Sequence, residues 1–298
     1  MRIKPPCIPC LLGDSYNTIC MSTEDEELRL KALSEVLAEL SKRIPERPTP
    51  GSLNTRLYRI VKRVTGVEDP YREKKKLSNK VAKRVVDHIR KNLDSIEDDL
   101  LRFKEAVSYA IAGNMIDFGI PSHRLNMEKL DEEVEKVKGR GLAIDDTEEI
   151  FKAARGAKVV YLIDNAGEAV FDGLLVRELK RLGAEVVVVA KGGPVSNDAT
   201  LEDAVDAGLG ELADRLATTG KDAVGLGLPD VNPELMSLLK SANLIISKGQ
   251  GNLEDLTEIE GDVGRPVAYL LNVKCDIIAG FLGVKKGDAV AKLSKPRA

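Results

Sequence analysis

The sequence KVVYLIDNAGE at residues 158–168 is the stretch that decides the fold of this chain. Residues 159–163 are apolar and mostly β-branched or aromatic, which predicts a short strand buried on both faces. A polar turn follows, and residues 171–182 then show the spacing of an amphipathic helix that ends at Gly183. A buried strand, a polar turn and a covering helix together predict one unit of a parallel α/β sheet.

Four more runs in the second half of the chain have the character of strands. They occupy residues 185–190, 215–218, 244–247 and 266–271, and the run at 215–218 is the weakest. Because these runs alternate with helical patterns, residues 143–298 are predicted to form a Rossmann-like α/β domain with a mainly parallel sheet.

The first half of the chain shows helical spacing instead. Apolar residues recur every three or four positions over residues 30–44, 53–64, 77–89 and 96–111. Thr23, with Glu26 three residues later, fits a capping box at the start of the first of these helices. No convincing strand precedes residue 142, so residues 1–142 are predicted to form an all-helical domain. The expected fold is therefore a helical domain followed by an α/β domain.

The composition is that of a folded protein without a membrane segment. The 298 residues carry 45 Lys and Arg against 48 Asp and Glu, a net charge of −3, and 43% of them are hydrophobic. No run is long and apolar enough for a membrane span or a secretory signal, so a cytoplasmic protein is expected. One Gln and no Trp beside abundant Glu and Lys resemble the composition of hyperthermophile proteins.

Charge is unevenly distributed along the chain. Residues 56–91 carry 13 basic and 4 acidic side chains, a local net charge of +9. Attraction of phosphorylated small molecules or of nucleic acid is one interpretation of such a stretch. We favour a solvated helix face for it, and we expect no nucleic-acid partner.

Polar side chains follow the predicted strands at their carboxyl ends, where open parallel sheets bind ligands. Asp164 and Asn165 follow the first strand, and Asp198 follows the second by way of a Gly-Gly-Pro loop. Carboxylate and amide oxygens are ligands that magnesium and manganese prefer, and cobalt or nickel would be tolerated. These three residues are therefore predicted to bind one divalent metal ion. A competing role for Asp198 is the N-terminal cap of the helix that follows it.

Lysines and glycines at the same strand ends predict an anion beside the metal. Lys191, Lys248 and Lys274 could hold phosphoryl oxygens as point charges. A surface position is the favoured interpretation for Lys191 and Lys274. The glycines of the same loops allow backbone amides to approach an anion closely.

Nucleotide cofactors and a serine nucleophile are poorly supported by the motifs. The first turn lacks the G-x-G-x-x-G phosphate loop, and the second strand ends in Lys191, where an acid usually binds the ribose. No G-x-S-x-G elbow is present, and the histidines, His88 and His123, lie in the helical half.

The cysteines form half of a recognisable metal or redox motif. Cys7 and Cys10 make a C-x-x-C pair, and Cys275 follows Lys274 at a strand end. No second C-x-x-C or His pair completes a zinc site. A three-cysteine site, a reduced thiol pair and a disulfide all remain open interpretations.

Several short segments resemble one known family in their order and spacing. They are residues 112–117 (AGNMID), 164–168 (DNAGE), 193–198 (GPVSND) and 247–254 (SKGQGNLE). The chain is similar to the damage-control phosphatases, first catalogued as domain of unknown function 89. The C-x-x-C pair and the Asp-Pro-Tyr at 69–71 resemble the small prokaryotic branch of that family.

The resemblance implies metal-dependent removal of phosphate from small phosphometabolites, such as damaged or side-product sugar phosphates. It implies a divalent metal on Asp164, Asn165 and Asp198, with Asp164 and Lys248 as catalytic residues. The substrate and its phosphate would be bound by the remaining matched positions, which are Asn114, Asp117, Glu168, Gly249, Asn252 and Glu254. Asn114 and Asp117 would close the site from the helical domain and are expected to face Asp164 across a cleft.

Alternatives remain open at this stage. The chain could bind phosphorylated ligands as a sensor without turnover, or it could be a carboxyl methyltransferase-like protein, a name given to one branch of the family. Within the phosphatase interpretation, Asp164 could attack phosphorus directly or act through the metal. The oligomeric state is not predicted.

Overall fold

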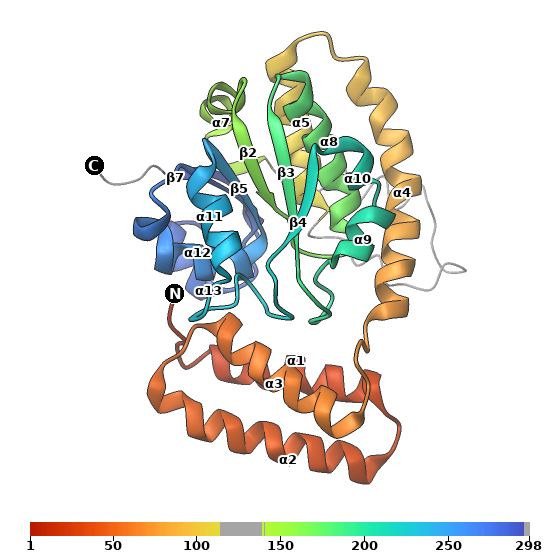
Figure 1. Ribbon diagram of the computed structural model, residues 1–298, viewed down its shortest axis with the longest axis vertical. Coiled ribbons are helices and arrows are strands. Elements are labelled where there is room, and N and C mark those ends of the chain that lie inside the picture. The colour runs from red at the N-terminus through yellow and green to blue at the C-terminus, as the bar shows by residue number, and fades with distance from the viewer. Residues whose placement is uncertain (114–138, 140, 295–298) are drawn as a thin grey trace.

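The computed structural model describes residues 1–113, 139 and 141–294 of the chain. A central sheet lies between two layers of helices, and a smaller group of N-terminal helices sits below one edge of that sheet (Figure 1). None of the described helices is both long and apolar enough to cross a lipid bilayer.

The sheet contains seven strands within the described residues, in the order β1-β7-β6-β5-β2-β3-β4. Their bounds are β1 Leu142–Asp145, β2 Lys158–Leu162, β3 Glu185–Ala190, β4 Arg215–Thr218, β5 Leu244–Lys248, β6 Val267–Asn272 and β7 Ala289–Ser294. Strands β6, β5, β2, β3 and β4 run parallel to one another. Strand β7 is antiparallel to β6, and β1 pairs parallel to β7. The mainly parallel sheet is thus confirmed.

Two of these strands were not expected from the sequence. Strand β1 has four residues, of which every second one is exposed, and β7 has only two buried positions. Neither therefore shows the continuous apolar run that marks a strand buried on both faces. All five predicted strands are present, including the weak one at β4.

Two helical layers cover the sheet. The helices of the first layer are α4 Arg72–Asp94, α5 Asp99–Ala112, α7 Thr147–Ala154 and α8 Glu168–Arg181, with α9 Leu201–Asp206 and α10 Leu209–Leu212 at its margin. The second layer comprises α11 Pro233–Ser241, α12 Gly249–Val263 and α13 Asp276–Leu282. Side chains along β2 alternate between the two cores, with Tyr161 in the first and Val160 in the second.

The N-terminal helices have a hydrophobic core of their own. They are α1 Cys7–Ser22, α2 Glu26–Arg43, the short 3₁₀ helix η1 Ile44–Glu46 and α3 Pro50–Thr65. Ile19, Val36 and Leu57 from the three longer helices are fully buried together. We call α1 to α3 the N-terminal unit. Helices α4 and α5, in contrast, share their core with the sheet, so the change of hydrophobic period near residue 142 does not divide the core.

The N-terminal unit packs against the loops that leave the carboxyl ends of the strands. Thr55 Oγ1 of α3 accepts a hydrogen bond of 3.0 Å from the Val224 amide, and Arg59 pairs with Asp222 at 2.6 Å. In Figure 1, α3 lies beneath the loops after β3 and β4. This unit therefore packs against the loops at the carboxyl edge of the sheet, where ligands were expected.

The start of α2 differs from the expected capping box. The cap is Asp25, whose carboxylate accepts a 3.1 Å hydrogen bond from the Leu28 amide. Thr23 instead follows the end of α1, where its amide donates to the Ile19 carbonyl. The sequence had not shown α1 as a helix, so the Thr23 prediction was wrong because that residue already belongs to another helix end.

Candidate active site

Backbone hydrogen bonds draw the ends of β2 and β3 together. The Ala199 amide donates to the Asp164 carbonyl at 2.8 Å, and the Ala166 amide donates to the Asn197 carbonyl at 3.0 Å. A short antiparallel bridge joins Asn165 to Asp198. The structure thus places Asp164, Asn165 and Asp198 at one point of the sheet edge, as the loop length had suggested.

Asp198 is not the cap of the next helix. Thr200 caps α9, and it forms a full capping box with Asp203. The competing role for Asp198 was therefore wrong, because Thr200, two residues further along the chain, directly precedes the helix and caps it. The Asp198 side chain is buried and remains directed to the sheet edge, with the Lys191 ammonium 3.6 Å from its Oδ2.

The Asn165 amide is oriented by two carboxylates. Its Nδ2 donates to Asp164 Oδ2 at 2.9 Å and to Glu168 Oε2 at 3.2 Å. With the nitrogen turned toward acids, the oxygen Oδ1 is the atom left to a cation. The side chain is thus set to contribute an oxygen ligand.

Gly249 allows the Asp164 carboxylate to occupy its position. Its φ is 75°, and a Cβ built there would lie 2.0 Å from Asp164 Oδ2. Any side chain at this residue would displace the carboxylate, and the backbone conformation also disfavours one.

The electrostatics of the three residues fit a bound cation. Burial raises the pKa of Asp164, and the nearby Glu168 carboxylate raises it further, while Lys274, Lys191 and Lys248 act in the opposite direction. Burial also raises the pKa of Asp198 to about 7 despite Lys191, with a contribution from Asp164. The surrounding lysines do not fully offset this buried negative charge. A divalent ion would do so.

The donor set is made of oxygens. No group of three or more His, Cys, Asp or Glu side chains is placed to hold a metal within the described part of the chain. The Asp164, Asn165 and Asp198 set has two carboxylates and one amide, so it falls outside that definition. Such a set suits a hard ion that keeps water or phosphate oxygens as its other ligands.

Lys248 has a different environment from the one expected of a phosphate-binding lysine. It is completely buried, and its ammonium donates to Glu168 Oε1 and Asp172 Oδ1 at 2.6 Å each and to the Ala110 carbonyl at 2.8 Å. Burial alone would lower the pKa of Lys248, but Asp172 and Glu168 raise it above its usual range. All three N–H groups are used, so this geometry supports a role in positioning Glu168 rather than contact with phosphate.

Asn252 and Lys191 also make internal contacts. Asn252 Nδ2 donates to the Ile163 and Lys248 carbonyls at 3.1 and 2.8 Å. Its Oδ1 accepts a 2.9 Å bond from Lys191, whose ammonium also donates to the Gly225 carbonyl at 2.7 Å. Lys191 is buried, so its interpretation as a surface charge was wrong. These contacts tie the ends of β2, β3 and β5 together.

The remaining candidates lie around this centre. Lys274 is exposed, and its positive charge lowers the pKa of Asp164, against the effect of burial. Glu254 is only partly exposed. Burial, with Asp255 and Asp164, raises its pKa to about 7, although the positive charge of the chain N-terminus lowers it. Asn114, Asp117 and His123 lie outside the described residues, and His88 is exposed on α4.

Sequence reasoning missed three polar residues near the site. Asn79, fully buried on α4, accepts a 2.6 Å hydrogen bond from the Gly167 amide and so fixes the turn before α8. Asp172 is the buried partner of Lys248 and also accepts a 2.8 Å bond from Tyr161. Asp14 of α1 contributes to the raised pKa of Asp198. Asp172 alone had a usable signal, since it is an acid within an otherwise apolar helix face.

Three thiols lie near one another at the margin of the site. Cys7 and Cys275 both raise the pKa of the Cys10 thiol, and Glu254 raises the pKa of both cysteines of the C-x-x-C pair. Burial raises the pKa of Cys7 and of Cys10. All four cysteines are free thiols in this structure.

Comparison with known proteins gives a consistent assignment of family. The family model described as damage-control phosphatase ARMT1-like domain matches residues 3–290. This chain belongs to the damage-control phosphatase family. A damage-control phosphatase of Archaeoglobus fulgidus is 39% identical over 98% of this chain and 99% of its own length. A relative of the same designation from Arabidopsis thaliana is 29% identical over 83% of this chain.

A solved structure shows the same fold in the family. The crystal structure of a DUF89 family protein from Pyrococcus horikoshii has a TM-score of 0.90 and 35% identity. The match covers 99% of this chain and all of that one. The helical N-terminal region and the α/β sheet are therefore arranged as in a solved member of the family.

Proposed function

We propose that this protein is a divalent-metal-dependent phosphatase that hydrolyses small phosphate monoesters, such as damaged or side-product sugar phosphates. Family membership and the names of the archaeal relatives support phosphatase chemistry. The observation that carries the proposal is the buried meeting point of Asp164, Asn165 and Asp198, where burial raises the pKa of both carboxyls, Glu168 raises that of Asp164 further, and Asp164 raises that of Asp198. A phosphate sensor would need cations, but it would not need this excess of oxygen ligands.

Asp164, Asn165 and Asp198 would hold the ion, which can be magnesium, manganese, cobalt or nickel. When bound, the ion supplies a Lewis acid for the phosphoryl oxygens. Lys274, as the exposed cation near Asp164, would bind phosphate and offset the charge that develops in the transition state. In the other route Asp164 would attack phosphorus directly as a nucleophile, so both routes would use the same carboxylate.

The remaining residues of the candidate set have supporting roles in this proposal. Glu168 and Lys248 would hold the Asn165 amide in place. Asn252 would hold Lys191, and Gly249 would leave room for the Asp164 carboxylate. Asp164 raises the pKa of Glu254, so the two carboxyls lie close enough to repel each other. Glu254 remains a candidate substrate contact, and the family resemblance gives Asn114 and Asp117 the same role.

The test is a phosphatase screen over a panel of phosphometabolites, with magnesium, manganese, cobalt and nickel compared. Asp164→Ala and Asp198→Ala should each lose at least 100-fold in turnover and most of their bound metal. Asp87→Ala, at an exposed acid of α4 outside the site, serves as the matched control and should behave as wild type. Normal turnover and full metal content in either site variant would refute the assignment. Ligand binding without turnover in the wild type would favour the sensor.

A further inference from the structure

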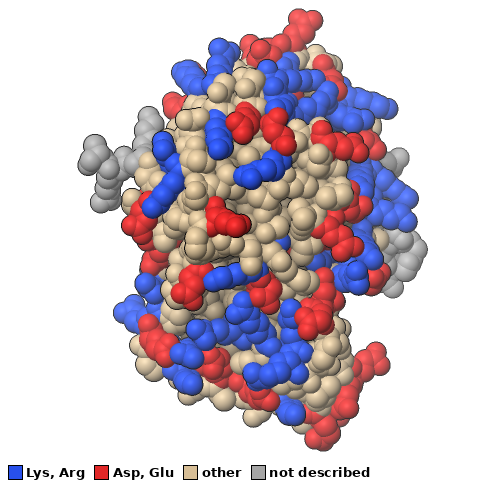
Figure 2. All heavy atoms as spheres, in the orientation of Figure 1, with Lys and Arg blue, Asp and Glu red and all other residues tan. Residues whose placement is uncertain are grey.

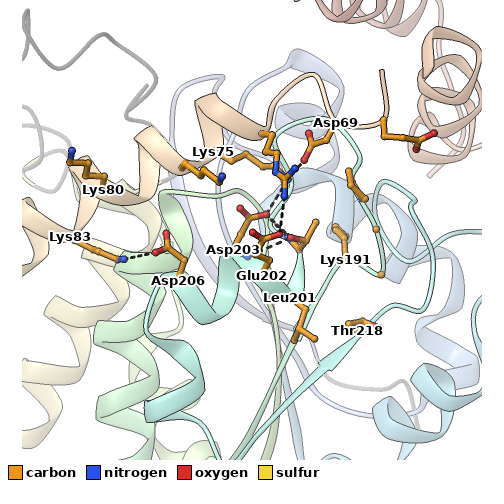
Figure 3. A pocket seen from close by; sticks show the side chains of 17 residues that line it. Asp69, Lys75, Lys80, Lys83, Lys191, Leu201, Glu202, Asp203, Asp206 and Thr218 are labelled. Atoms are coloured by element: carbon orange, nitrogen blue, oxygen red, sulfur yellow. Dashed lines mark hydrogen bonds and ion pairs between the residues drawn. The ribbon is translucent and has the colours of Figure 1, made fainter. Parts of the chain in front are cut away.

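A pocket of about 1020 Å³ lies between α4 and the loop that follows β3. Figure 3 shows it from close by, with lysines of α4 along one side and acids of α9 facing them. Its other wall is formed by residues 191–194 of the β3 loop. The basic stretch that the sequence suggested was a solvated helix face therefore lines a hollow.

Cations of α4 line the pocket along one side of the helix. Arg72, Lys76, Lys80 and Lys83 are spaced by three or four residues, which places them in one row. Figure 2 shows Lys and Arg side chains gathered along the edge of the molecule where α4 runs. The row extends over about 16 Å, from the helical rise of ~1.5 Å per residue.

Most acids of the pocket already have a partner. Lys75 is buried in the wall and pairs with Asp69 at 2.9 Å and with Asp203 at 3.0 Å. Lys83 pairs with Asp206 at 2.8 Å. These contacts build the wall, and they leave these three acids unavailable to the other cations of the row.

Among the residues that the structure describes, the other cations of the row lack a firm partner. Lys76 is 3.8 Å from Glu73, whose side chain is 88% exposed, and Arg72 is 3.9 Å from Glu202. Lys80 makes no ion pair with any residue in the described ranges. Exposed pairs at such distances contribute little energy, so these charges remain available to a ligand.

Lys191 connects this pocket to the candidate active site. It lines the pocket, and its ammonium lies 3.6 Å from Asp198 Oδ2. A ligand with its reacting phosphate at Asp164 and Asp198 could therefore extend past Lys191 toward α4. No aromatic side chain is among the described residues that line the pocket, so it offers nothing on which a base would stack.

We propose that the α4 pocket binds a second anionic group of the substrate, a phosphate or a carboxylate remote from the ester that is hydrolysed. The inference rests on the proposed function and narrows it to phosphometabolites with two anionic ends. The pocket volume is that of a small-molecule site.

The test compares phosphate esters that differ in the distal group. The double variant Lys76→Ala/Lys80→Ala should raise KM for glucose 1,6-bisphosphate at least tenfold, with kcat within twofold. Its kinetics with p-nitrophenyl phosphate should not change. The matched control Lys91→Ala/Lys240→Ala removes the same charge from exposed lysines outside the pocket and should alter neither substrate.

A binding measurement separates this inference from the proposed function. Calorimetric titration of metal-free protein with tripolyphosphate should show binding that the double variant weakens at least tenfold and the control does not. An unchanged KM for the bisphosphate, or an equal loss with p-nitrophenyl phosphate, would overturn the pocket assignment. If wild type hydrolyses no ester, the phosphatase proposal fails, whereas selective loss of tripolyphosphate binding would still support the pocket as an anion site.

Discussion

Lys248 shows how much depends on a single buried charge. Its ammonium joins Glu168 of the α8 start to Asp172 one turn later, and Asp172 also accepts from Tyr161. The chain of contacts continues from Glu168 to Asn165 and then to Asp164. Lys248 thus acts on the site through its neighbours, since its own donors are fully used.

Replacing Lys248 with Met should therefore affect stability and metal affinity together. Two buried carboxylates would lose their shared cation, which typically costs about 3–5 kcal/mol of unfolding free energy. Urea unfolding measures this loss, and Asp172→Asn in the same chain should restore part of it by removing one of the unpaired charges. Lys240→Met, at an exposed lysine, is the control and should stay within ~0.5 kcal/mol of wild type. A Lys248→Met protein as stable as the control would show that the ion pair contributes nothing.

Helix α12 begins at the candidate site with a glycine in the left-handed backbone conformation. It begins at Gly249, directly after β5, and the positive φ of that glycine lets the helix start against the Asp164 carboxylate. Gly261 lies near the other end of the same helix, where a Cβ would meet nothing within 4 Å. Gly249 and Gly261, two of the three glycines of this helix, thus have opposite requirements.

Gly249→Ala should destabilise the protein, while Gly261→Ala should leave it equal or slightly more stable. The first change places a Cβ in the left-handed region, at a cost of about 1–2 kcal/mol, and pushes the carboxylate aside. The second replaces glycine in a helix by alanine, a gain of roughly 0.5–1 kcal/mol. Thermal unfolding with and without manganese measures both effects, and only Gly249→Ala should lose the metal-dependent stabilisation. Equal behaviour of the two variants would contradict this account of the strand-to-helix junction.

At the scale of the whole molecule, the N-terminal unit and the α/β part meet around Glu254. The chain N-terminus pairs with Glu258 at 2.9 Å and also contacts the Glu254 carbonyl. The Glu254 carboxyl is held in this junction with its pKa raised to about 7 by burial and by Asp255. Ionising it therefore weakens the folded molecule.

Glu254→Gln should make stability less dependent on pH. In wild type the unfolded chain releases this proton near its usual pKa of 4.5, and the folded chain releases it near 7. The folded state therefore binds more protons in between, and this group lowers stability as pH rises from about 4.5 to 7. The variant should match wild type near pH 4 and exceed it by about 1–2 kcal/mol at pH 8, after allowance for its exposed edge. Denaturation curves at several pH values test this, and a constant difference across the range would contradict it.

Sequence patterns alone identified five strands of the mainly parallel sheet and the edge at which their polar ends gather. Buried parallel strands must be apolar on both faces, so five of them could be read as continuous runs. Their polar ends then indicated Asp164, Asn165 and Asp198. Strands β1 and β7 could not be read in this way, because β1 alternates between exposed and partly buried residues and β7 has only two buried positions.

The tertiary structure decided which of the polar side chains are free and which are engaged. Lys248 contacts Asp172, Glu168 and Ala110, which lie 76, 80 and 138 positions away along the chain. Asn79 contacts Gly167, which lies 88 positions away. Such partners are fixed by the packing of α4, α5 and α8 on the sheet, which no local pattern encodes. The same packing turned the basic face of α4 into a pocket wall beside Lys191. Residue types and strand ends are local properties of a chain, whereas burial and charge pairing depend on segments that meet only after folding.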